Sequence, residues 1–425
     1  MVTGQDLFNS IAQGYNSNSI MQYVIRLKEK IGFELLKKAV EISLLQEPVL
    51  GCRLKNASGK LTWEPVDSKD SCCYQVEEGE SKNAIDEILE KELNPQEGVQ
   101  ILVCLICGKS SDTICVKISH AACDGCGSKH YIRILSEIYT QLSLDINFRP
   151  KISTQERSTD RLYLALGIKN KQEFFQPELA ELNSTWGISA DSAEHSQFQY
   201  ELMSFTKAEF ESLHQYAKQH RTTINSVVLA AYYSSLLKAV QISNNEAEKE
   251  IQVMIDLRKY LPCGIQQDIC NLSSEFNINL PVQFKDDMQK LISIVTNEME
   301  KAKNKKAFIH GAVGVDLAAE SGYAAIKNSY VSEWEHIKAT GNCTPMLSNL
   351  GVLSTTPISF ADVKVKEVDY VPPAFYAPAV MLGICTYCSR LTLCVSYYTP
   401  EISAHRIKEI LACTCESLHI LTNKA

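Results

Sequence analysis

The chain has 425 residues, of which 45% are hydrophobic and 22% are charged, and its formal net charge is −8 at pH 7. This length allows two or three domains, each with a core of its own. The acidic balance argues against a broad electrostatic footprint on nucleic acid or anionic lipid, so we expect no nucleic-acid partner.

The N-terminal residues lack the basic and apolar regions of a secretory signal. The longest uncharged run, residues 370–389, contains three prolines, so we expect no membrane span there. The 16 cysteines occur in a long chain without an export signal, which favours free thiols in a reducing cytoplasm. Three C-x-x-C pairs leave a structural zinc site as the minor alternative. Two of these pairs lie in strand-like runs, where residues three apart face opposite ways, so we expect no metal.

The first half of the chain mixes helical and strand patterns. Residues 32–54 carry apolar residues at helical spacing, then a proline that ends the helix, then a short strand. A helix with one apolar stripe is predicted from about Ser128 to Leu142. The other clear elements in this half are strand 59–66, helix 84–94, strand 99–107 and strand 113–119.

Residues 145–200 are poorer in pattern, and we interpret them as the connection between two halves. Residues 222–240 are apolar on nearly all sides, which predicts a buried helix with Thr222 or Thr223 near its cap. Thr399 and Pro400 are expected to open the last amphipathic helix. The other elements predicted in this half are helix 206–220, strand 250–258 and strand 390–398.

Residues 118–130, ISHAACDGCGSKH, hold the most informative stretch for function. If residues 113–119 form a strand, Ile118 and His120 share one face with further apolar residues. His120 then continues an inward row at the end of the strand, where an imidazole is shielded but reachable. The competing interpretation is a core histidine beside a tight turn, which is the commoner case for an isolated histidine.

Small residues follow His120, and Gly125 and Gly127 allow tight turning before the next helix. Asp124 stands where the chain leaves the strand, and a buried carboxylate there needs a cation or several donors. The competing interpretation of Asp124 is an ordinary loop aspartate. The position of this short pattern at a strand end favours the functional interpretation.

His120, Asp124 and Gly125 resemble the H-x-x-x-D-G motif of the CoA-dependent acyltransferase superfamily. That superfamily includes chloramphenicol acetyltransferase, condensation domains of peptide synthetases, BAHD acyltransferases, alcohol O-acetyltransferases, wax ester synthases and polyketide-associated acyltransferases. The resemblance covers most of the chain. Its further segments are, in chain order, EPVLGCRL (47–54), TTINSVVLAAYYSSLL (222–237), VMIDLRKYLP (253–262), NLSSEFNINLP (271–281), PMLSNLGVL (345–353) and LCVSYYTPEISAHRIKEIL (393–411).

Two branches of the superfamily fit less well. Condensation domains usually carry a second histidine before the motif, where this chain has Ser119, and the D-F-G-W-G element of BAHD enzymes is missing. The alcohol and polyketide-associated branches fit better. The resemblance implies an α/β fold of two chloramphenicol-acetyltransferase-like subdomains, each a mixed sheet flanked by helices, in a V with a tunnel between them. We assign residues 1–170, with the motif, to the first subdomain and residues 171–425 to the second.

The resemblance also implies roles for the motif residues. His120 is expected to be the general base that takes a proton from an acceptor hydroxyl or amine as it attacks a thioester. Asp124 is expected to point away from His120 and to pair with an arginine, for which Arg258 is the candidate. The alternative for Arg258 is a surface residue after a strand. Gly125 completes the catalytic motif.

The late Ser-Asn-x-Gly element supplies candidates for binding the thioester oxyanion. Ser348 or Asn349 could donate to it, and Gly351 would let the backbone approach closely. An ordinary turn is the alternative. His130 follows the motif at helical spacing, which predicts a solvent-side residue. Cys123 and Cys126 flank the Asp-Gly pair, and a catalytic thiol there is the minor alternative, because no activating partner is evident apart from His120 itself.

The implied co-substrate is an acyl-CoA, and the implied partner is a small-molecule acceptor. Two alternatives stay open. One is a free-standing condensation-type enzyme that uses a phosphopantetheine thioester on an acyl or peptidyl carrier protein. The other is a non-catalytic relative that binds a ligand in the tunnel. Nucleophile-elbow, P-loop and dinucleotide-binding motifs do not occur in the sequence.

Overall fold

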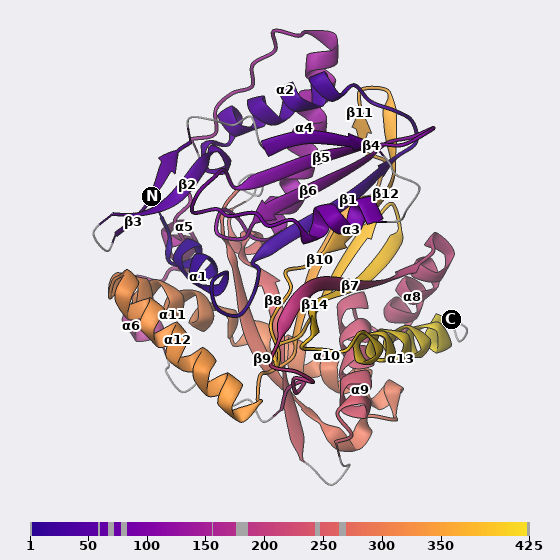
Figure 1. Ribbon diagram of the computed structural model, residues 1–425. Helices are drawn as coiled ribbons and strands as arrows, with labels where there is room; N and C mark the ends of the chain where they lie inside the picture. The colour runs from indigo at the N-terminus through magenta and orange to yellow at the C-terminus, as the bar shows by residue number, and fades with distance from the viewer. Residues whose placement is uncertain are drawn as a thin grey trace.

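Two six-stranded sheets organise the molecule, with a small two-stranded sheet beside them (Figure 1). The structure is a computed structural model. Its described residues are 2–57, 60–66, 72–77, 83–154, 156–175, 186–242, 247–262 and 269–422. In Figure 1 the sheet with the N-terminal strands lies above the sheet formed by the second half.

The first sheet contains strands from both halves of the chain. Its spatial order is β11 (Ser359–Phe360), β12 (Val363–Val371), β1 (Ile20–Leu27), β6 (Thr113–Ser119), β5 (Ile101–Cys107) and β4 (Cys73–Glu77). Neighbouring strands are antiparallel except β4 and β5, which are parallel. The late strand β12 pairs with β1, so the second half of the chain crosses over to complete the first sheet.

The second sheet is also mixed, and β10 lies inside it between two parallel neighbours. Its spatial order is β7 (His195–Phe205), β14 (Arg390–Pro400), β13 (Met381–Tyr387), β10 (Met346–Ser354), β8 (Glu248–Asp256) and β9 (Ser273–Pro281). The two-stranded sheet pairs β2 (Cys52–Ala57) with β3 (Lys60–Pro65).

Helices cover the two sheets and the space beside them. The α-helices of the first half are α1 (Gly4–Ala12), α2 (Phe33–Gln46), α3 (Asn83–Glu90), α4 (Gly125–Leu144), α5 (Asp160–Leu166) and α6 (Lys171–Phe174). Those of the second half are α8 (Lys207–Gln219), α9 (Ile224–Ala239), α10 (Met288–Asn304), α11 (Phe308–Glu320), α12 (Tyr323–Thr340) and α13 (Ala404–Thr422). Short 3-10 turns are η1 (Pro48–Gly51), η3 (Leu257–Tyr260) and η4 (Val282–Phe284).

Alternation along β6 explains why α4 packs where it does. Ile114, Val116 and Ile118 are fully buried on one face of the strand, in the same core cluster as residues of α2 and α4. Burying such side chains contributes roughly 1.5–3 kcal/mol each. The chain leaves β6 at His120 and returns as α4, so the predicted motif lies at the junction of strand and helix.

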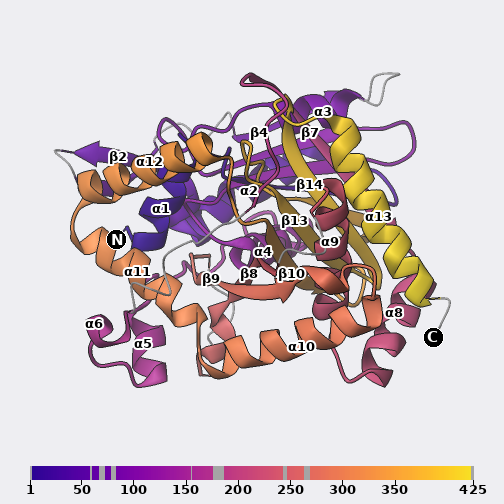
Figure 2. The same cartoon turned by 90° about the horizontal axis from the view of Figure 1, so that it is seen from below.

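The second core shows why residues 222–240 are apolar on all sides. Helix α9 is buried from Ser226 to Leu237, because α10, α13 and the second sheet surround it. Figure 2 shows α9 and α13 next to each other beside that sheet. The side chain of Thr223 caps α9 by accepting the N–H of Ser226 at 3.1 Å.

The predicted mixed α/β class is confirmed, and several element boundaries differ. Within the described part of residues 145–200, the connection holds α5 and α6, and β7 already begins at His195. Pro400 ends β14 instead of opening the last helix, which begins at Ala404. Residues 370–389 contain the end of β12 and all of β13. In the described ranges, none of the helices is both long and apolar enough to cross a membrane.

Candidate active site

His120 is the first residue beyond β6. Its N–H donates to the carbonyl of Ser19 at 2.8 Å, and its carbonyl accepts from the side-chain amide of Asn271 at 3.0 Å. Both peptide groups of the residue are therefore held, which fixes the direction of its Cα–Cβ bond. The side chain is half-buried, and its Nδ1 atom is enclosed without a hydrogen-bond partner in the described part of the chain.

The surroundings of His120 lower the pKa of its imidazole below the ordinary value. Burial is the main cause, because the imidazolium would lose its hydration there. Asp124, the residue's own backbone and Asn271 act in the opposite direction, but they do not offset burial. The imidazole is therefore neutral at pH 7, which is the form that accepts a proton.

Asp124 is the N-cap residue of α4 and is buried together with Arg258. One of its oxygens, Oδ1, accepts from the N–H of Gly127 at 2.9 Å. The other, Oδ2, accepts from the N–H of Leu272 at 2.7 Å and from Nη1 of Arg258 at 2.8 Å. The structure thus brings the predicted pair of Asp124 and Arg258 together across 134 positions of sequence.

Arg258 lies on η3, directly after β8, and only 1% of its surface is exposed. Its guanidinium also donates to Oδ1 of Asp256 at 3.1 Å and to the carbonyl of Cys270 at 2.8 Å. Burial alone would raise the pKa of the Asp124 carboxyl, but Arg258 and the two N–H donors outweigh burial and keep that pKa below its ordinary value. Asp124 is therefore ionised at neutral pH and fully occupied as an anchor of the loop.

Gly125 begins α4 at the point where β10 passes close to it. A Cβ atom on Gly125 would lie 3.2 Å from Cδ2 of Leu350, and Nζ of Lys129 donates to the carbonyl of Leu350 at 2.8 Å. The backbone of Gly125 is not in the left-handed region. Its missing side chain therefore makes room for Leu350, whereas the sequence suggested tight turning as the reason for a glycine.

Ser348 lies on β10, two residues before Leu350, the residue that packs against Gly125. Leu347 belongs to the core behind the second sheet, whereas Leu350 packs into the core of the first. Side chains alternate along a strand, so the Ser348 side chain points away from the core that contains Leu347. The Ser348 side chain is half-buried there.

Asn349 is occupied by its own surroundings. Its Oδ1 accepts from the N–H of Gly351 at 2.7 Å, and its Nδ2 donates to Asn225 at 3.0 Å. Gly351 has φ 68°, which favours glycine. The pairing of β10 with β13 shifts register after Asn349. Asn349 therefore holds an irregular segment of β10, and Ser348 is the more available donor.

The remaining polar groups near the motif are poor nucleophiles or bases. Burial raises the pKa of the Cys123 thiol well above its ordinary value and that of Cys126 to about 12, so both stay protonated. The predicted solvent-side position of His130 is wrong. His130 is half-buried, and burial together with Arg133 and Arg258 lowers its pKa to about 4. The first turns of α4 pack against β10, which explains this burial.

Two further residues contact the motif, and nothing in the sequence assigns them that role. Asn271 donates to the carbonyls of His120 and Ala121 at 3.0 and 3.1 Å. Arg157 donates to the carbonyl of Ala122 at 2.9 Å. Both are single polar residues far from the motif in the chain, so only the folded structure reveals that they contact it.

A comparison with protein families matches residues 5–247 to the condensation domain. This match covers more than half of the chain, which therefore belongs to the condensation-domain family within the CoA-dependent acyltransferase superfamily. Ser119 argued against the condensation branch, and the match shows that this one position does not exclude the family. A comparison with curated proteins found no significant match.

Solved structures of the same fold cover nearly the whole chain. Polyketide synthase associated protein 5 from Mycobacterium tuberculosis is 15% identical, with a TM-score of 0.70 and 98% coverage of both chains. TRI3 trichothecene 15-O-acetyltransferase from Fusarium sporotrichioides is 13% identical, with a TM-score of 0.76 and coverage of 99% of this chain and 94% of its own. The first condensation domain of the CDA synthetase is 12% identical, with a TM-score of 0.73 and coverage of 99% and 95%.

These similarities establish the fold as two chloramphenicol-acetyltransferase-like subdomains, each with a mixed sheet flanked by helices. They confirm the predicted fold class and superfamily. Family membership points to an enzyme of the acyltransferase type.

Proposed function

We propose that this protein transfers an acyl group from an acyl-CoA thioester to a hydroxyl or amine acceptor, with His120 as the general base. The observation that carries the proposal is the neutral, half-buried imidazole at the end of β6, next to the buried pair of Asp124 and Arg258. The peptide groups on both sides of this residue are hydrogen-bonded, which fixes the direction of its Cα–Cβ bond. In this proposal residues 1–170 and 171–425 form the subdomains, and the substrates meet in a tunnel between them.

The proposed reaction begins when the acceptor oxygen or nitrogen attacks the thioester carbonyl. Nε2 of His120 takes the acceptor proton as the new bond forms, and the carbonyl oxygen becomes an oxyanion. The carbon–sulfur bond then breaks, and the imidazolium returns the proton to the departing thiolate. Proton transfer of this kind contributes roughly 10²–10⁴-fold to a rate.

The other motif residues have supporting roles in this proposal. The carboxylate of Asp124 is saturated by Arg258 and backbone N–H groups, so it holds the loop and leaves proton transfer to His120. The hydroxyl of Ser348 donates to the oxyanion, and Asn349 holds the segment that carries Ser348. Gly125 lets β10 approach the loop closely.

The test follows thioester turnover with and without the base. Purified protein is incubated with acetyl-CoA and with longer acyl-CoAs, and free CoA is measured by mass spectrometry. We expect His120→Ala to lower release by at least about a hundredfold while circular dichroism stays unchanged. The control is His214→Ala, because His214 is exposed on α8 and we expect wild-type turnover from it. A fully active His120→Ala variant would contradict the proposal.

Membership of the condensation-domain family favours one alternative donor, a phosphopantetheine thioester on a carrier protein. Ser119 in place of a second histidine counts against it. A kinetic comparison of acetyl-CoA with an acetylated carrier protein separates the two donors through their kcat/KM ratio. Thioester binding without turnover, for every acceptor tried, would instead support a non-catalytic relative.

A further inference from the structure

Three successive carbonyl groups of the motif loop, those of residues 120–122, are bound by side chains instead of backbone partners. Asn271 binds the first two, and Arg157 binds the third. Buried carbonyl groups outside regular structure need such partners. The two side chains therefore supply the hydrogen-bond donors that a neighbouring strand supplies to carbonyl groups inside a sheet.

A single buried carboxylate joins these two side chains. Asp6, on the first turn of α1, accepts from Nη2 of Arg157 at 2.9 Å through each of its oxygens, and from Nδ2 of Asn271 at 2.9 Å. The Asp6 side chain has 0% exposure, and that of Arg157 has 15%. Trp63 also donates to Asp6, at 3.3 Å. The carboxylate thus orients both donors that face the loop.

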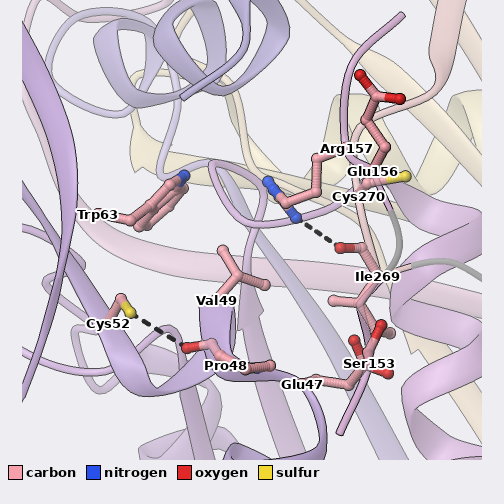
Figure 3. Close-up of a pocket in the computed structure, with 10 residues that line it drawn as sticks. All are labelled: Glu47, Pro48, Val49, Cys52, Trp63, Ser153, Glu156, Arg157, Ile269 and Cys270. Carbon is pink, nitrogen blue, oxygen red and sulfur yellow. Dashed lines mark hydrogen bonds between the residues drawn. The ribbon is translucent and has the colours of Figure 1, made fainter. Parts of the chain in front are cut away.

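The three residues come from three separate parts of the fold. Asp6 belongs to α1, Arg157 to the segment between α4 and α5, and Asn271 to the residues just before β9. Figure 3 shows Arg157 between Trp63 and the backbone at Ile269, at the wall of a cavity of about 240 Å³. The guanidinium donates to the Ile269 carbonyl as well, at 2.5 Å. The loop is therefore tied to both halves of the chain.

We propose that Asp6, Arg157 and Asn271 form a positioning unit that sets the backbone of residues 120–122 and thereby the direction of the His120 ring. The inference rests on the proposed role of His120 as base. The bond from Asn271 holds the peptide group directly after His120, so its loss lets this peptide plane rotate. A displacement of about 1 Å in a reacting group can cost on the order of a hundredfold in rate.

The test combines hydrogen exchange with kinetics in Asn271→Ala and in the milder Asp6→Asn. We expect exchange of the amides in peptides that cover residues 119–124 to rise at least about tenfold in both variants. In Asn271→Ala we expect kcat for thioester release to fall by about ten- to a hundredfold, with KM within about threefold of wild type. If a substitution only lowered the stability of the fold, exchange would not rise selectively in the loop. The kcat of the folded fraction would then stay at the wild-type value.

The matched control is Asp369→Asn. Like Asp6, Asp369 is a buried carboxylate bound by arginine, in this case by both Arg26 and Arg390. It lies on β12 and makes no contact with the loop among the described hydrogen bonds. We expect it to lower Tm while loop exchange and kcat stay at wild-type values.

The outcomes separate this inference from the proposed function. Unchanged loop exchange in both folded variants would overturn the positioning unit, and so would faster exchange with wild-type kcat. If the wild-type protein releases CoA from no donor, the proposed function fails, and the exchange measurement alone decides whether the three residues hold the loop. If Asn271→Ala does not fold, Asp6→Asn carries the same measurements.

Discussion

Two segments carry the proposed chemistry, and the protein fixes them in different ways. The loop of residues 120–125 depends on side chains, since Asn271 and Arg157 bind its carbonyls and Arg258 binds Asp124. Residues 348–351 belong to β10. Ser348 and Asn349 pair with β13 along the backbone, and the side chain of Asn349 holds the irregular stretch that follows by accepting the N–H of Gly351.

This difference predicts which substitutions lower both stability and rate, and which lower the rate alone. In the loop, a side chain that holds the backbone also holds His120, so its loss affects stability and rate together. At Ser348 the backbone pairing with β13 holds the chain, and the Ser348 side chain takes part in none of the described hydrogen bonds, so we expect its loss to affect the reaction alone. A substitution to alanine should therefore lower both stability and rate in the loop, but only the rate on the strand.

The largest effect is expected from Asp124→Ala. The change leaves the guanidinium of Arg258, which is 1% exposed, without its buried counter-charge. Breaking a buried pair in this way costs about 3–5 kcal/mol of the free energy of unfolding. The N-cap of α4 is lost as well, at a cost of about 1 kcal/mol. Urea unfolding monitored by fluorescence gives the stability, and CoA release should fall with it.

Asp256→Ala is the matched control for that measurement. Asp256 binds the same guanidinium at 3.1 Å, but 41% of its side chain is exposed. We expect a cost of about 1 kcal/mol or less. Equal losses of stability in the two variants would refute the idea that the buried anchor, rather than charge near Arg258 in general, holds the loop.

A smaller and more selective effect is expected from Ser348→Ala. Removing one oxyanion donor lowers kcat on the order of a hundredfold, while the free energy of unfolding changes by less than about 0.5 kcal/mol. Steady-state CoA release and urea unfolding measure the two quantities. Ser354→Ala, at the end of the same strand, removes a hydroxyl that bonds only the backbone of Thr356 among the described hydrogen bonds, so it should leave kcat unchanged. A Ser348→Ala enzyme with wild-type kcat would remove the oxyanion role from this residue.

Much of the fold could be predicted because local patterns and tertiary packing agree. In residues 113–119 the apolar side chains of one parity pack under α2 and α4, and residues 222–240 are uniformly apolar because α9 is enclosed. The crossover of β12 into the first sheet could not be predicted in the same way. Its pairing with β1 joins Val371 to Gln22, and no local pattern encodes a contact over that distance in sequence.

The site residues also differ in whether a local sequence pattern predicts them. The spacing of His120 and Asp124 is local, and a strand end followed by a helix N-cap is visible in the sequence. Asn271 is one asparagine among many, and its contact with the His120 carbonyl depends on how the second half packs against the first. The prediction for His130 is wrong for a related reason. Helical spacing predicts which face of the helix a residue lies on, but not which element packs against that face.

The most direct test of the central claim is the pKa of His120 itself. Protein with carbon-13-labelled histidines gives one titrating signal for each of its nine histidines, and His120→Gln identifies the signal of His120. We predict a midpoint below the ordinary value of about 6.5, because burial disfavours the imidazolium. The acid limb of kcat/KM should follow the same midpoint, since the neutral ring persists until the pH falls through it. A midpoint at or above 6.5 would contradict the account of His120 as a buried, neutral base.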